Sequence, residues 1–123
     1  MLEQEALDYL ERSNRYWRQA QEFLEKGEPA KAAEMSWGSV VARAEALAVH
    51  RTRSALGNHR GIRRFIRDIA REEGPEELYY LFSLAESLHV DFYREFLEAE
   101  DVRLHLVSLG RFSEQIDRLI YGS

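Results

Sequence analysis

Prolines and glycines divide this chain into helical segments. The only two prolines, Pro29 and Pro75, each follow a glycine by one or two residues. A glycine readily closes a helix in the left-handed conformation, and a proline fits the first turn of the next helix. Between these breaks apolar residues recur every three or four positions, and no window of six residues alternates as a strand would. The sequence therefore predicts an all-α fold.

The apolar periodicity places about five helices in a chain of 123 residues, which is a suitable length for one domain over residues 1–123. We expect an antiparallel bundle, with Asn58 as the N-cap of the third helix. The predicted helices are Glu3–Lys26, Pro29–Val49, His59–Glu73, Pro75–His89 and Asp101–Tyr121, with a connection at Arg51–Asn58 and a short amphipathic segment at Asp91–Glu98.

The second predicted helix is apolar or small on nearly all sides. Trp37 and Val40 belong to one apolar stripe, and further apolar or small residues such as Ala42 cover much of the remaining surface. A helix of this kind is buried on most sides, so we expect it at the centre of the bundle. Gly38 weakens a helix by roughly 1 kcal/mol, which indicates that a neighbouring group approaches its backbone closely.

Positive charge is concentrated in one segment of an acidic chain. The formal net charge is −5, yet residues 50–71 contain seven arginines and a single acid, Asp68. Helical spacing places four of these arginines on one side of the third helix, opposite its isoleucines, over roughly 16 Å. These four are Arg60, Arg64, Arg67 and Arg71.

Two interpretations of this arginine-rich helix are open. Guanidinium groups bind phosphate oxygens well, so the helix could bind RNA, a nucleotide or another polyanion. The same arginines could instead pair with carboxylates of this chain or of a second copy, and charge patterns alone favour such pairing.

Two pairs of residues suggest chemistry. Arg53 and His59 would suit a metal-independent endoribonuclease, in which histidine transfers protons and arginine stabilises charge on phosphorus. Glu86 and His89 form the Glu-x-x-His half of a di-iron site, but the chain has no second copy of that motif. Cysteine, glycine-rich phosphate loops and common hydrolase motifs are absent. We therefore predict no metal and no cofactor.

Location and assembly follow from composition. The opening MLEQEALDYLER is acidic rather than a basic and apolar leader, and no apolar stretch is long enough to cross a membrane. We expect a cytoplasmic protein without membrane contact. With two Trp, six Tyr and six Phe, the chain has more aromatic surface than a small bundle hides, which favours a homodimer or another protein partner.

Three stretches together resemble the archaeal PaREP family of small helical proteins. They are residues 16–51 (YWRQAQEFLEKGEPAKAAEMSWGSVVARAEALAVHR), 58–69 (NHRGIRRFIRDI) and 85–97 (AESLHVDFYREFL). The last contains Leu88, His89, Phe92 and Tyr93 of a Leu-His-x-x-Phe-Tyr signature.

The layout is also similar to the wider HEPN group. That resemblance implies an antiparallel helical bundle, commonly dimeric, among nucleotide-binding proteins, toxin–antitoxin components and ribonucleases. The group's ribonucleases have an arginine, four to six residues and then a histidine, a spacing that Arg53 and His59 match. The leading hypothesis is a non-catalytic interaction module that binds RNA or a nucleotide through the third helix. The alternative is a HEPN-type, toxin-like endoribonuclease.

Overall fold

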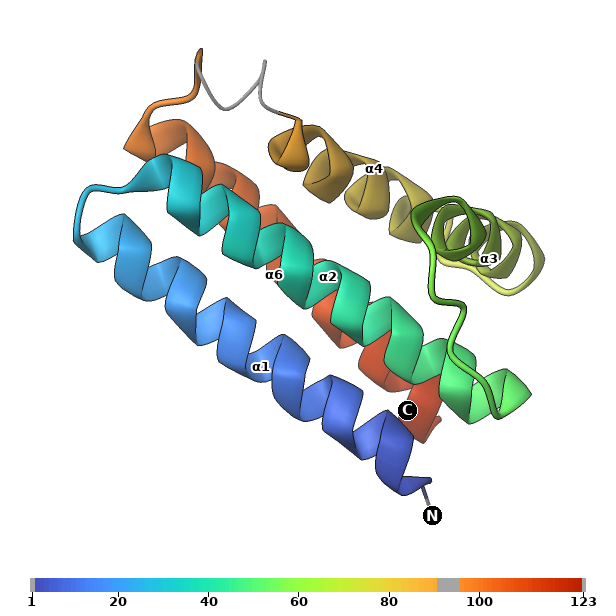
Figure 1. Ribbon diagram of the computed structural model, residues 1–123. Coiled ribbons are helices and arrows are strands. Elements are labelled where there is room, and N and C mark those ends of the chain that lie inside the picture. The colour runs from blue at the N-terminus through green and yellow to red at the C-terminus, as the bar shows by residue number, and fades with distance from the viewer. Residues whose placement is uncertain (1, 91–95, 123) are drawn as a thin grey trace.

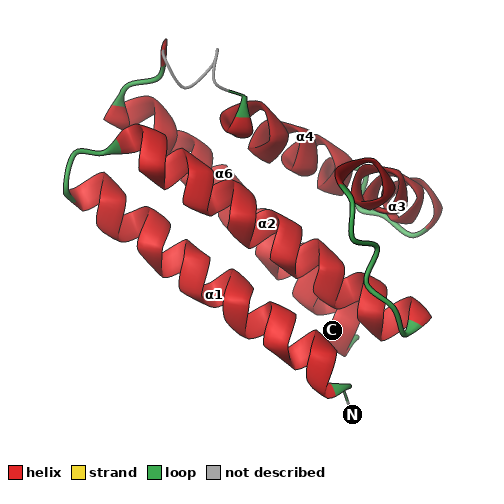
Figure 2. Cartoon of the chain, viewed as in Figure 1, coloured by secondary structure: helices red, strands yellow, loops and turns green. Residues whose placement is uncertain are grey.

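The computed structural model describes residues 2–90 and 96–122. Within these residues the chain forms helices and no strand, which confirms the all-α class (Figure 2). The helices are α1 (Gln4–Glu25), α2 (Pro29–Thr52), α3 (His59–Glu72), α4 (Glu77–His89) and α6 (Ala99–Tyr121). Most of the amphipathic segment expected at 91–98, including Phe92 and Tyr93 of the signature, lies outside the described residues.

Local hydrogen bonds set the helix ends. Asn58 caps α3 as predicted, because its side-chain oxygen accepts the Gly61 N–H at 2.7 Å. The second helix ends at Thr52, three residues later than expected, where Arg53 takes the left-handed conformation with φ 68°. The last helix begins two residues early, because Glu98 and Asp101 form a reciprocal capping box around its first turn.

Helix α2 lies at the centre of a packed helical bundle, as its composition predicts. It packs against α1, α3, α4 and α6. Figure 1 shows α1 and α2 running antiparallel, and α4 antiparallel to both α2 and α6. Helix α3 is seen almost end-on in the same view, so it crosses the other four helices. Among the described residues, α1 packs on α2 and α6 but not on α3 or α4.

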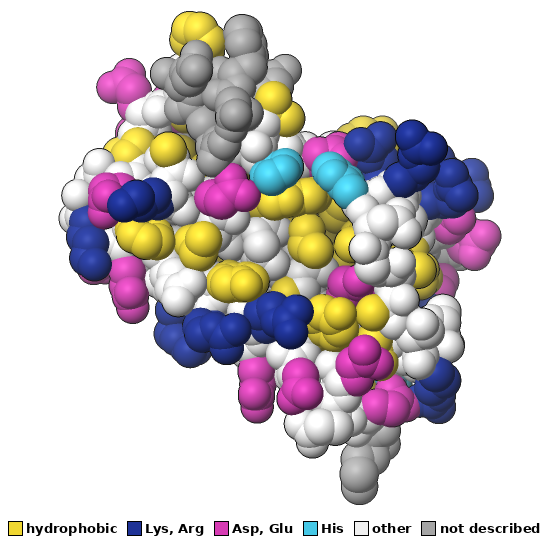
Figure 3. Space-filling view, in the orientation of Figure 1, with side chains coloured by type: hydrophobic (Ala, Val, Ile, Leu, Met, Phe, Trp, Pro, Cys, Tyr) yellow, Lys and Arg dark blue, Asp and Glu magenta, His cyan; other side chains and the backbone are white. Residues whose placement is uncertain are grey.

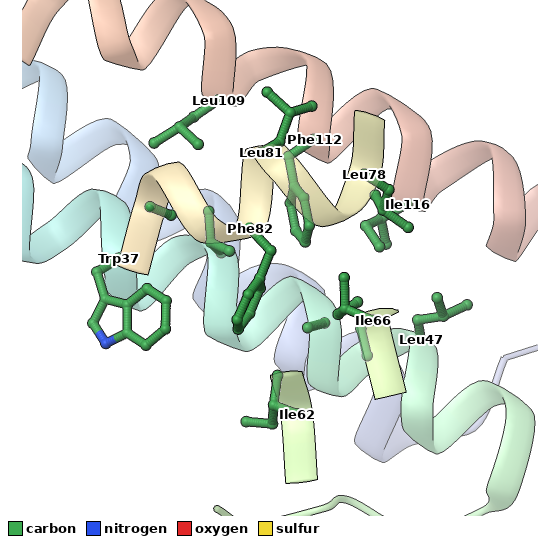
Figure 4. Packing of buried hydrophobic residues seen from close by; sticks show 14 of the residues in the cluster. Trp37, Leu47, Ile62, Ile66, Leu78, Leu81, Phe82, Leu109, Phe112 and Ile116 are labelled. Carbon is green, nitrogen blue, oxygen red and sulfur yellow. The ribbon is translucent and has the colours of Figure 1, made fainter. Parts of the chain in front are cut away.

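The main core fills the space between α2, α3, α4 and α6 (Figure 4). The rings of Phe82 and Phe112 are fully buried, with their centroids 6.4 Å apart. On the other side of α2, Gly38 lies under the ring of Tyr16. A Cβ atom at Gly38 would be 3.1 Å from Tyr16 Cδ2, so the predicted close approach to this glycine is confirmed.

A buried polar cluster joins α1, α2 and α6. The guanidinium of Arg43, a residue only 8% exposed, donates to both carboxylate oxygens of Asp117 and to the side-chain oxygens of Asn14 and Ser13. This pairing compensates the cost of burying a charge and links α2 to α1 and α6. No helix in the described ranges is long and apolar enough to cross a membrane.

Candidate functional site

A cleft of about 490 Å³ lies above α2, between α1 on one side and α3 and α4 on the other. It stays open because α1 does not pack on α3 or α4 in the described chain and because small residues of α2 form its floor. We call it the central cleft. It is lined by Tyr9, Arg12 and Tyr16 of α1, by Trp37, Gly38, Val41, Ala42 and Glu45 of α2, and by Gly57, Asn58, His59, Ile62, Phe82 and His89 from the remaining walls.

Two histidines pack against Trp37 at the edge of the central cleft. The His59 ring lies 5.0 Å from the Trp37 ring and the His89 ring 5.2 Å from it, measured between centroids. The two imidazoles are 6.5 Å apart. Figure 3 shows two neighbouring histidine side chains above an apolar hollow, with Lys and Arg side chains along its opposite edge. The cluster joins the start of α3 to the end of α4.

A carboxylate holds each of these imidazoles. Glu86 Oε2 lies 2.5 Å from His59 Nε2 and also accepts hydrogen bonds from the Arg63 guanidinium. Glu34 Oε1 lies 3.1 Å from His89 Nδ1. Both side chains remain about two-fifths exposed, 43% for His59 and 42% for His89. The rings are therefore fixed in orientation and still open to a ligand.

Glu45 positions the connection that leads into α3. Its side chain is buried, and its two carboxylate oxygens accept the backbone N–H groups of Leu56 and Gly57, each at 2.8 Å. Gly57 has a φ of +77°, a conformation that residues with a Cβ rarely adopt. This anchor, together with the Asn58 cap, fixes where His59 enters the wall of the cleft.

The four arginines predicted to share a face of α3 are all exposed; we call them the arginine face. Arg67 and Arg71 share a single carboxylate, Asp68, at 3.5 and 3.0 Å. Arg60 and Arg64 have no salt-bridge partner within the described ranges. Lys and Arg side chains gather over α3 in Figure 3. This surface therefore carries more positive charge than its neighbouring acids neutralise.

The remaining arginines of residues 50–71 are paired. Arg51 donates two hydrogen bonds to Glu73, which raise the pKa of Arg51 and lower the pKa of the Glu73 carboxyl. Arg53 forms an ion pair with Glu3. Arg63 pairs with Glu86. The pairing interpretation thus describes Arg51, Arg53 and Arg63, whereas Arg60 and Arg64 have no carboxylate partner among the described residues.

The proposed ribonuclease residues have different partners. Arg53 lies at the end of α2 against Glu3, and it does not line the central cleft. His59 does line it, and contacts Glu86. Glu86 and His89, the two residues of the Glu-x-x-His half-motif, also have separate partners. Glu86 contacts His59, and His89 contacts Glu34 on α2.

The opposite wall of the cleft was not predicted from the sequence. Tyr9, Arg12 and Tyr16 follow the ordinary spacing of an amphipathic helix, and nothing in that spacing distinguishes them. One local signal pointed to the cleft, namely Gly38 directly after Trp37. A glycine beside a large aromatic residue leaves a depression in the surface of a helix.

The fold and the site define an all-α bundle with an aromatic cleft and an exposed arginine face. The model of the archaeal PaREP1/PaREP8 family matches residues 8–109, most of the chain. The chain therefore belongs to this family, as the resemblance implied. No curated protein and no solved structure matches this chain.

Proposed function

We propose that this protein binds RNA through the arginine face of α3. The observation that carries the proposal is that Arg60 and Arg64 are exposed and have no carboxylate partner in the described part of the chain. Arg67 and Arg71 extend the same face and share only Asp68. Planar guanidinium groups spaced along one side of a helix suit a run of phosphates.

Binding is favoured over catalysis by the partners of the ribonuclease pair. Arg53 is neutralised by Glu3, and His59 lies at the cleft beside Glu86. An endoribonuclease that uses this pair would need both side chains in one cleft, and only His59 lines the central cleft. Incubation of RNA in EDTA with wild type and with His59→Ala separates the two functions, because a binding protein leaves the RNA intact in both cases.

The proposal is tested by removing charge from the arginine face. Arg60→Ala with Arg64→Ala should weaken the binding of single-stranded RNA at least about tenfold at low salt, since two phosphate contacts are lost. The matched control is Arg103→Ala with Arg118→Ala on α6, which changes the net charge equally at exposed positions elsewhere. Equal weakening in both double variants would contradict a specific site on α3. Circular dichroism checks that each variant is folded.

We further propose a HEPN-like homodimer in the cytoplasm. The antiparallel order of the long helices supports the HEPN-like arrangement (Figure 1). Leu104 and Val107, one turn apart on α6, are 59% and 69% exposed and supply apolar surface for a second copy.

A further inference from the structure

The central cleft has the size and openness of a small-molecule site. Its volume of about 490 Å³ falls within the range of pockets that bind small organic ligands. Ala42 on the floor contributes almost no side chain, and Gly38 one turn earlier lets the Tyr16 ring of the α1 wall pack against α2. The cleft takes no part in the phosphate binding proposed for the arginine face, so it needs a separate explanation.

Aromatic rings surround this space from four helices, α1, α2, α3 and α4. Tyr9 and Tyr16 of α1 stand opposite His59 and His89, and Trp37 of α2 packs against both imidazoles. Rings arranged in this way bind a flat aromatic ligand by stacking, and every nucleobase presents such a face. A purely hydrocarbon ligand would form no hydrogen bonds with the tyrosine hydroxyls and imidazole nitrogens.

Polar groups in the same walls can reach the edges of a base. Each imidazole is oriented by a carboxylate, His59 by Glu86 and His89 by Glu34. Arg12 lies on the opposite wall and stacks its guanidinium 4.8 Å from the centre of the Tyr9 ring. A few oriented polar groups in an aromatic pocket are typical of sites that fix the orientation of a ligand.

The central cleft and the arginine face meet at the start of α3. His59 is the first residue of that helix and lines the cleft, and Arg60 follows directly as the first member of the arginine face. We propose that the central cleft receives one unpaired base of single-stranded RNA whose adjoining phosphates lie along the arginine face. This inference rests on the proposed function, and it names single-stranded RNA as the target. Bases inside a duplex are stacked and cannot enter such a cleft.

The test compares three oligonucleotides of equal length by fluorescence anisotropy. They are a single-stranded RNA, the same backbone with abasic sites throughout, and a blunt RNA duplex. If a base enters the cleft, the single strand binds about tenfold or more tightly than the abasic strand. Equal affinity for these two would overturn the base site and leave phosphate binding intact. Failure of all three to bind would overturn the proposed function itself.

Single substitutions test whether the preference for the intact strand depends on the central cleft. Tyr16→Ala and His59→Ala should each reduce the preference for the intact strand over the abasic one, and Tyr121→Ala, an exposed tyrosine at the end of α6, should leave it unchanged. In a Trp17→Phe background Trp37 is the only tryptophan, and the single strand should quench its fluorescence whereas the abasic strand should not. An unchanged preference in both cleft variants, or no quenching of Trp37, would contradict the proposal.

Discussion

At the scale of single residues, the buried guanidinium of Arg43 is the clearest case of a charge that needs its partner. Asp117→Asn removes that partner, and we expect it to lower the free energy of unfolding by about 1–3 kcal/mol. This is below the usual cost for a fully buried pair, because the Asp117 side chain is 38% exposed and water replaces part of the interaction. Urea unfolding measures the change. Glu100→Gln, which breaks the exposed pair with Arg103, is the control and should have almost no effect.

Glu77 provides a prediction about pH. Hydrogen bonds from Arg111, and then from Gln115, lower the pKa of the Glu77 carboxyl in the folded state. A lowered pKa stabilises the fold above the carboxyl's ordinary pKa, and this contribution is lost as pH falls through the lowered value. Glu77→Gln should therefore have a lower Tm than wild type near pH 7, and the difference should vanish in strong acid. A Tm difference that persists unchanged after the carboxyl is protonated would contradict this assignment.

At the scale of elements, the connection between α2 and α3 depends on Glu45. In Glu45→Gln the amide has one acceptor for two backbone N–H groups, those of Leu56 and Gly57. We expect a loss of about 1–2 kcal/mol, because charge-assisted bonds are replaced and one part-buried donor loses its acceptor. Hydrogen exchange at Leu56 and Gly57 should become faster. Unaltered exchange there would mean that Glu45 does not anchor the connection.

Most elements of this fold were predictable, because their signals are local in sequence. The breaks at Pro29 and Pro75, the cap at Asn58 and the small residues of α2 each act within one or two turns. The extension of α2 to Thr52 was not predictable, since the final turn depends on how the following loop is held.

Only the part of the candidate site that depends on local sequence was predictable. Helical spacing alone places the arginine face on one side of α3. The central cleft brings together Tyr16, Trp37 and His89, which are far apart in the chain and meet only because α1 and α4 flank α2. Nor could spacing indicate that Arg53 pairs with Glu3, fifty residues away.

At the scale of the whole molecule, the exposed apolar residues of α6 predict the assembly. Light scattering should show a homodimer for wild type, and Leu104→Glu with Val107→Glu should give a monomer, because two charges would be buried unpaired in the interface. Tyr80→Glu, at an equally exposed position on α4, is the control and should remain dimeric. A monomeric wild type would contradict the proposed homodimer but not the RNA binding proposed for the arginine face of α3.

The central claim is that RNA phosphates bind the arginine face of α3, and the salt dependence of binding tests it most directly. Each phosphate contact with a single strand contributes about −0.7 to the slope of log K against log salt. Four contacts predict a wild-type slope near −3, and Arg60→Ala with Arg64→Ala should reduce its magnitude by about 1.4. A wild-type affinity that does not change with salt, or an identical slope in the double variant, would contradict the claim.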